Sequence, residues 1–165
     1  MNEVQNYFML TGTGAVTLMG LLFVIITLGV ARSERGYKGL LPVFVTPTLV
    51  HLAAVFLIAL LALSPERDSL VWPFGLVGIT GLVYSLSIAR KAIRYDGLYS
   101  GSWLPHGGIP FVCYAGIVTA ACLGLTSTSH AYLVLRAVSA LLLLNAMRNS
   151  WAVAADVAQS KGGSA

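Results

Sequence analysis

Charged residues are scarce in this chain. Only 10% of its 165 residues are Asp, Glu, Lys or Arg and 57% are hydrophobic, whereas a soluble domain carries about a quarter charged residues. The few basic charges gather where long uncharged runs end, notably between residues 32 and 38 and between residues 90 and 94. So little charge excludes a water-covered surface over most of the molecule. The sequence therefore predicts a polytopic membrane protein whose main partner is the lipid bilayer.

The sequence also lacks the motifs of several familiar chemistries. It contains no phosphate-binding glycine loop, no histidine box of a membrane di-iron enzyme, no histidine pair suited to haem and no potassium-channel filter sequence. We therefore expect no cofactor, no metal site and no catalytic residues. The net charge is +4, and most of the basic residues that produce it lie at the ends of apolar runs, where they are explained by their role in membrane orientation. We accordingly expect no nucleic-acid partner.

Cysteine occurs only as Cys113 and Cys122. On one helix these residues lie on opposite sides and about 13 Å apart along the axis. They cannot form a disulfide within the chain, and we expect both to be buried small residues.

The uncharged runs provide room for five transmembrane helices of about 20 residues each. We predict an all-α, polytopic transmembrane helical bundle that forms a single domain over residues 1–165, with a glycine-rich interfacial segment at 95–110. Thr46 can cap the second helix, with Pro47 at its first position, and Ser129 can cap the fifth. The predicted spans are 8–31, 47–64, 69–93, 111–127 and 130–158.

The basic clusters predict the orientation of the bundle. They follow the first span and end the third, whereas the N-terminus carries only Glu3. Because basic residues of short loops stay on the cytoplasmic side, we expect the N-terminus outside and the C-terminus inside.

Small residues recur at intervals of four along the third and fourth predicted helices. Such ridges let helix backbones approach closely in lipid, so we expect helix contacts within the protomer or between protomers. The two ridges are Gly81, Ser85 and Ala89, and Gly116, Ala120 and Gly124.

The fifth predicted helix carries a polar stripe. Asn145, Arg148, Asn149 and Asp156 fall within roughly 100° of one another around the axis. One interpretation is structural: Arg148 reaches the cytoplasmic headgroups and Asn145 bonds to a neighbouring helix. The other is a polar inner vestibule in which Arg148 contacts anions or headgroups and the two asparagines form the lining.

His51 is an ionisable residue inside the second predicted span, with Thr46 and Thr48 nearby. It is a candidate for a proton relay or a pH gate because histidine titrates near neutral pH. The structural alternative is an imidazole that is hydrogen-bonded to a backbone carbonyl, to Tyr84 or to Asn149.

Arg136 is the other intramembrane cation of the fifth predicted helix. It lies on the side of that helix opposite Asn145, near the outer end. We expect it to extend to the outer interface or to pair with Glu66 or Asp68.

Two segments resemble known proteins. The run from Ala15 to Val24, AVTLMGLLFV, is similar to the first helix of small, multi-span bacterial inner-membrane proteins of uncharacterised function. The helix ending Arg148-Asn149-Ser150-Trp151, followed by Asp156, resembles an ending seen in similar bacterial proteins. The resemblance implies a multi-pass location in the bacterial inner membrane. It implies no activity and no site residues.

These features predict a homo-oligomeric, channel-like or transport-related assembly rather than an enzyme. Its polar cavity would be lined by Asn145, Arg148 and Asn149, with Thr46, Thr48 and His51 near the inner mouth. Two alternatives stay open. One is a non-catalytic accessory subunit bound to other membrane subunits, and the other is a small membrane enzyme with a site at the cytoplasmic interface.

Overall fold

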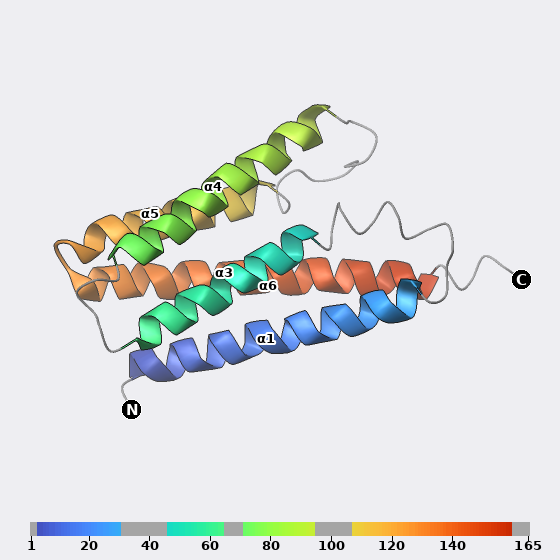
Figure 1. Ribbon diagram of the computed structural model, residues 1–165, viewed down its shortest axis with the longest axis horizontal. Helices are drawn as coiled ribbons and strands as arrows, with labels where there is room; N and C mark the ends of the chain where they lie inside the picture. The colour runs from blue at the N-terminus through green and yellow to red at the C-terminus, as the bar shows by residue number, and fades with distance from the viewer. Residues whose placement is uncertain (1–2, 31–45, 65–70, 95–106, 160–165) are drawn as a thin grey trace, which may run out of the picture.

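The structure is a computed structural model that describes residues 3–30, 46–64, 71–94 and 107–159, and within these residues every regular element is a helix (Figure 1). This confirms the predicted all-α fold with five helices. The helices are α1 (Glu3–Val30), α3 (Thr46–Leu63), α4 (Val71–Arg94), α5 (Ile109–Gly124) and α6 (Thr128–Gln159).

Four of the helices, α1, α3, α4 and α6, are long and apolar enough to cross a membrane. Helix α5 is also apolar but has 16 residues, so it extends over about 24 Å. Helix α5 is thus the shortest of the five described helices, and α3, with 18 residues, is the next shortest.

Helix α1 begins at Glu3 rather than at Phe8. Hydropathy marks the membrane-buried part of a helix, and the polar residues before Phe8 are compatible with one more helical turn. Glu3 lies in the first turn, where a carboxylate interacts favourably with the helix dipole.

A turn of three residues, 125–127, joins α5 to α6. The amide of Ser127 donates a 2.7 Å hydrogen bond to the carbonyl of Leu123, and the amide of Ala131 donates one of 3.1 Å to the carbonyl of Ser127. Ser129 consequently lies inside α6 and does not precede it as predicted. The residue before α6 is Ser127, whose hydroxyl oxygen lies 2.7 Å from Nδ1 of His130.

The predicted interfacial segment overlaps α5. Its residues 95–106 lie outside the described part of the chain, whereas residues 107 and 108 form a π-helical turn that leads directly into α5. Pro110 lies in the first turn of α5, where a missing amide hydrogen has no cost.

Successive helices run in alternating directions, as Figure 1 shows. The start of α1 and the end of α6 therefore lie at opposite ends of the bundle. The ends of α1 and α4, which adjoin the two basic clusters of the sequence, lie at the same end as the end of α6. The helix ends that adjoin basic residues thus lie at one end of the bundle, and the start of α1, with Glu3, lies at the other.

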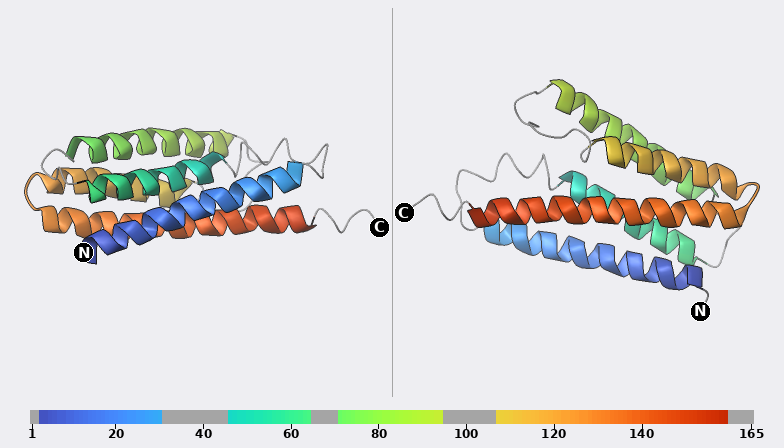
Figure 2. Two further views of the ribbon diagram at one scale, coloured as in Figure 1. Left: turned by 60° about the horizontal axis from the view of Figure 1, so that its bottom comes forward. Right: turned by 180° about the vertical axis from the view of Figure 1, so that it is seen from behind.

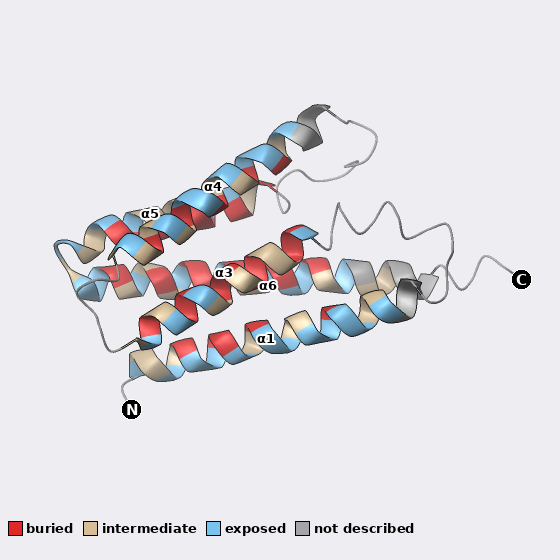
Figure 3. Cartoon of the chain, viewed as in Figure 1, coloured by how far each residue is buried: buried red, intermediate tan, exposed pale blue. Residues whose placement is uncertain are grey.

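Helix α6 is the centre of the packing. It contacts α1, α3 and α5, whereas α4 packs mainly on α5 and touches α3 only lightly. The right-hand view of Figure 2 shows α6 between α5 and α1, and both views show α4 at the edge of the bundle. Buried residues follow the facing sides of the helices, and the outward faces of α1 and α4 are exposed (Figure 3).

Candidate functional site

The buried polar residues lie mainly on α3, α4 and α6. His51, Thr48 and Ser85 are fully buried, and Asn145 and Asn149 are 5% and 4% exposed. In an apolar bundle such groups are costly unless they find partners or serve a function. They are the starting point for a candidate site.

His51 is held by a tyrosine from a helix that is distant in sequence. Its Nδ1 lies 3.0 Å from the hydroxyl oxygen of Tyr114 in α5, and the two ring centres are 5.7 Å apart. The ring of Tyr84 in α4 stands edge-on to the imidazole at 6.4 Å. His51 thus links α3 to α5 through its hydrogen bond to Tyr114 and to α4 through its ring contact with Tyr84.

Tyr114 can occupy this position because the facing surface of α4 is made of glycine. A Cβ at Gly81 would overlap the ring of Tyr114, and one at Gly78 would lie 2.7 Å from Cγ2 of Val118. Nearer the start of α4, a Cβ at Gly75 would lie 3.9 Å from Cβ of Ala121. The glycines of α4 therefore form a groove against which α5 packs, and this packing fixes the position of Tyr114 along the bundle axis.

The small-residue ridges predicted from the sequence contact neighbouring helices of the same chain. A Cβ at Gly116 would lie 2.6 Å from Cγ1 of Val138 in α6, and one at Gly124 would lie 3.3 Å from Cγ2 of Val71 in α4. The ridge of α4 continues past Ser85 to Ala89, whose Cβ would be 3.3 Å from a Cβ at Gly107. Ala120 is also buried. The ridges thus serve the packing of the protomer.

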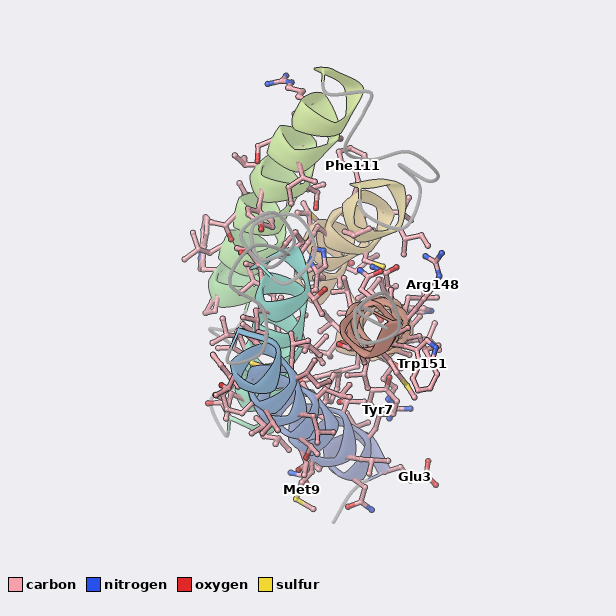
Figure 4. The ribbon with its side chains drawn as sticks, turned by 90° about the vertical axis from the view of Figure 1, so that its right-hand side faces the viewer. Glu3, Tyr7, Met9, Phe111, Arg148 and Trp151 are labelled. Atoms are coloured by element: carbon pink, nitrogen blue, oxygen red, sulfur yellow. The ribbon has the colours of Figure 1, made fainter. Side chains whose placement is uncertain are left out.

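The polar stripe of α6 divides into two parts. Asn145 and Asn149, one turn apart, face the interior, whereas Arg148 is exposed and projects from the flank of the helix (Figure 4). The side chain of Asp156 lies outside the described part of the chain. The two asparagines are therefore interior groups, and Arg148 belongs to a different surface.

Of the two predicted site threonines, Thr46 and Thr48, only Thr48 is interior. Thr48 is fully buried one turn before the imidazole, whereas Thr46 is exposed at the start of α3. Ser85 of α4 is buried on the same face as Gly81, one turn nearer the basic end of the bundle. Within the described residues its hydroxyl has no hydrogen-bond partner.

A groove between α3 and α4 leads to the tyrosines. It has a volume of about 370 Å³, and Tyr84, Tyr114 and Gly81 contribute to its lining together with Thr80. The remaining lining is apolar and comes from α3 and α4. Because α3 and α4 pack only lightly, a groove is left between them, and it reaches Tyr114, the partner of His51.

Arg136 is held by the first helix at the other end of the bundle. The hydroxyl of Tyr7 donates a 2.7 Å hydrogen bond to the carbonyl of Arg136, and the guanidinium carbon lies 5.7 Å from the centre of the Tyr7 ring. The residues predicted to pair with it, Glu66 and Asp68, lie outside the described part of the chain. Its contact with Tyr7 was not foreseen.

The described residues contain no group of three or more His, Cys, Asp or Glu side chains placed to hold a metal ion. Cys113 and Cys122 are both free thiols. Cys113 is buried as expected, but the expectation was wrong for Cys122, which is exposed because it faces away from α4 and α6.

Sequence reasoning missed Tyr114, the partner of His51. The only available signal was the glycine line of α4, which indicates that a bulky group packs there without indicating which helix supplies it. Comparisons with protein-family models, with curated proteins and with solved structures gave no match.

Proposed function

We propose that this chain is a transport-related integral membrane protein with a polar site inside the protomer, centred on His51 and Tyr114. It would cross the bacterial inner membrane five times, with the N-terminus outside and the C-terminus inside. In that orientation His51 and Tyr114 each lie about 7.5 Å from the inner ends of their helices. The site would therefore lie in the inner half of the membrane.

The observation that carries this proposal is the buried hydrogen bond between His51 and Tyr114. A histidine that is fully buried among membrane-spanning helices is a candidate for proton or solute transfer, because it can change charge near neutral pH. The phenol hydroxyl both donates and accepts hydrogen bonds, so it can pass a proton to or from the imidazole. In this proposal the pair is the central unit of a proton path.

The surrounding polar groups support a path for protons or a small polar solute. Thr48, Ser85, Asn145 and Asn149 are buried and lie toward the same end of the bundle as His51. Hydroxyl and amide groups of this kind replace the hydration of a permeating species. Arg148 faces outward, so the site we propose does not use it to select anions.

We further propose that copies of the chain associate. The ridges of α4 and α5 already pack within the protomer, so a homo-oligomer would use outward faces, such as the exposed side of α1. In this model each copy carries its own polar site, and no central pore is required.

Proteoliposomes that contain a pH-sensitive dye test the proposal. We expect a membrane potential to drive proton flux through the wild type, and His51→Gln to reduce that flux to the level of protein-free liposomes. His130→Gln is the matched control, because His130 is exposed and bonds only near the α5–α6 turn. The control should leave the flux unchanged.

Two further arms separate the alternatives. Asn145→Leu should reduce the flux, and Arg148→Ala should not. Absence of proton and anion flux in a folded wild type, at acidic and neutral pH and at both polarities, would contradict the proposal. Co-purification with other membrane subunits would then favour the accessory role.

A further inference from the structure

A second groove lies between α1 and α6, near the ends of both helices and away from His51. Its volume of about 550 Å³ falls within the range typical of ligand sites, about 300–1,000 Å³. Helix α1 contributes Leu18, Leu21, Leu22 and Ile25, which share one face. This side of the groove is entirely apolar.

Helix α6 contributes the other wall and the only charge of the lining. Met147 and Ala154 continue the apolar surface, and Arg148 and Trp151 line the same groove. Both Arg148 and Trp151 are exposed, and Figure 4 shows them projecting outward from α6. An apolar channel that carries one guanidinium suits an amphiphile with an anionic head.

The position of Arg148 along α6 agrees with that chemistry. Arg148 lies about 30 Å from Thr128, the first residue of α6, which equals the thickness of the hydrocarbon core. Trp151 follows by one turn, at the depth where indole rings are enriched. The guanidinium is thus at headgroup level, while Leu18 and Leu21 lie deeper among the acyl chains.

We propose that this groove binds an anionic phospholipid. One acyl chain would lie along α1 between Leu18 and Ile25, and the phosphate would accept hydrogen bonds from Arg148. Arginine suits this role because its planar fork can bind a phosphate through two parallel hydrogen bonds. This lipid site does not depend on the proposed proton path at His51, so either proposal can be refuted without affecting the other.

Quenching of Trp151 by brominated lipids tests the proposal. The W72F and W103F substitutions leave Trp151 as the single indole, and the protein is reconstituted with dibrominated phosphatidylglycerol or dibrominated phosphatidylcholine in an unbrominated background. We expect about a fivefold preference for phosphatidylglycerol, the size of one charge contact at a membrane surface. Equal quenching by the two lipids would overturn the proposal.

Two pairs of variants locate the binding. Arg148→Gln should abolish the preference for phosphatidylglycerol. Arg90→Gln should retain it, because Arg90 is an exposed arginine of α4 near the same end of the bundle but outside the groove. Ala154→Phe fills the groove and should weaken quenching by both lipids. Its control is Ala152→Phe, at an exposed position that does not line the groove.

Arg148→Gln and Ala154→Phe can each refute one part of the proposal. A preference that survives Arg148→Gln would show that general surface charge attracts the lipid, and would refute the role of the guanidinium. Quenching that is unchanged in Ala154→Phe would refute occupation of the groove. Circular dichroism of each variant verifies that the helices are intact.

Discussion

Nδ1 of His51 lies 3.0 Å from the hydroxyl oxygen of Tyr114, although 63 positions separate the two residues in sequence. The contact joins α3 to α5, which are not consecutive helices. Both residues are buried, so neither can replace the other's hydrogen bond with bulk water. The pair therefore contributes to the packing of the bundle as well as to any function.

We expect Tyr114→Phe to destabilise the protein by about 1–3 kcal/mol, because it leaves a buried imidazole nitrogen without this partner. The measurement is the free energy of unfolding in mixed micelles. His51→Phe and the double variant complete a mutant cycle, which should give a coupling energy of about 0.5–3 kcal/mol. If the losses of the two single variants simply add in the double variant, the hydrogen bond contributes nothing to the free energy of unfolding.

The orientation of α5 decides whether the chain has five spans. We expect cysteines introduced at Ser64 and at Ser129, in a background without Cys113 and Cys122, to react with an impermeant maleimide from outside. A cysteine at Lys161 should react only from inside. The physical reason is the alternation of helix directions together with the basic residues at one end.

The outcome at Ser129 is the critical one. If α5, with its 16 residues, did not cross the membrane, Ser129 would react from inside while Ser64 reacted from outside. Labelling of lysed cells verifies that each introduced thiol is accessible in principle.

The bundle itself was predictable from the sequence, because hydropathy and basic residues report on the membrane. Helix starts were predictable where a local signal exists: α3 begins at Thr46, just before Pro47. The start of α1 at Glu3 was not, because polar residues extend a helix beyond the lipid without any apolar signal.

The candidate site was predictable only in part. His51 was recognised because an ionisable residue in an apolar run is conspicuous. Its partner Tyr114 was not, because pairing across α3 and α5 depends on how non-consecutive helices pack. Likewise, angular spacing grouped Arg148 with Asn145 and Asn149, but the position of α1 beside α6 places Arg148 on another surface.

Gly81 is expected to tolerate no side chain. A Cβ there would overlap the ring of Tyr114, so Gly81→Ala must displace the ring or separate α4 from α5. We expect a loss of at least about 1–3 kcal/mol, as for other overpacked cores. Gly20→Ala is the matched control, because a Cβ at Gly20 meets nothing within 4 Å. Equal stability of both variants in a detergent melt would contradict the close packing of Tyr114.

Gly116 offers a compensation test of the contact between α5 and α6. A Cβ at Gly116 would lie 2.6 Å from Cγ1 of Val138, so Gly116→Ala should destabilise the protein by about 1–3 kcal/mol. Val138→Ala removes the opposing methyl groups and should be destabilising alone, because Val138 is buried. In the double variant the new methyl occupies the vacated space, and part of the loss should be recovered. If the double variant loses more free energy of unfolding than the two single variants together, the contact between Gly116 and Val138 is contradicted.

Tyr7 should stabilise the contact between α1 and α6 through two separable interactions. Tyr7→Phe removes the hydrogen bond to the carbonyl of Arg136 but keeps the ring beneath the guanidinium, so we expect a loss of about 0.5–1.5 kcal/mol. Tyr7→Leu also removes the cation–π contact and should lose about 0.5–2 kcal/mol more. Arg136→Met, which retains the backbone carbonyl, should make the Phe and Leu variants more nearly equal in their free energy of unfolding. If the difference between them is the same with methionine at position 136, the ring acts through its apolar packing on α6 and not through the charge of Arg136.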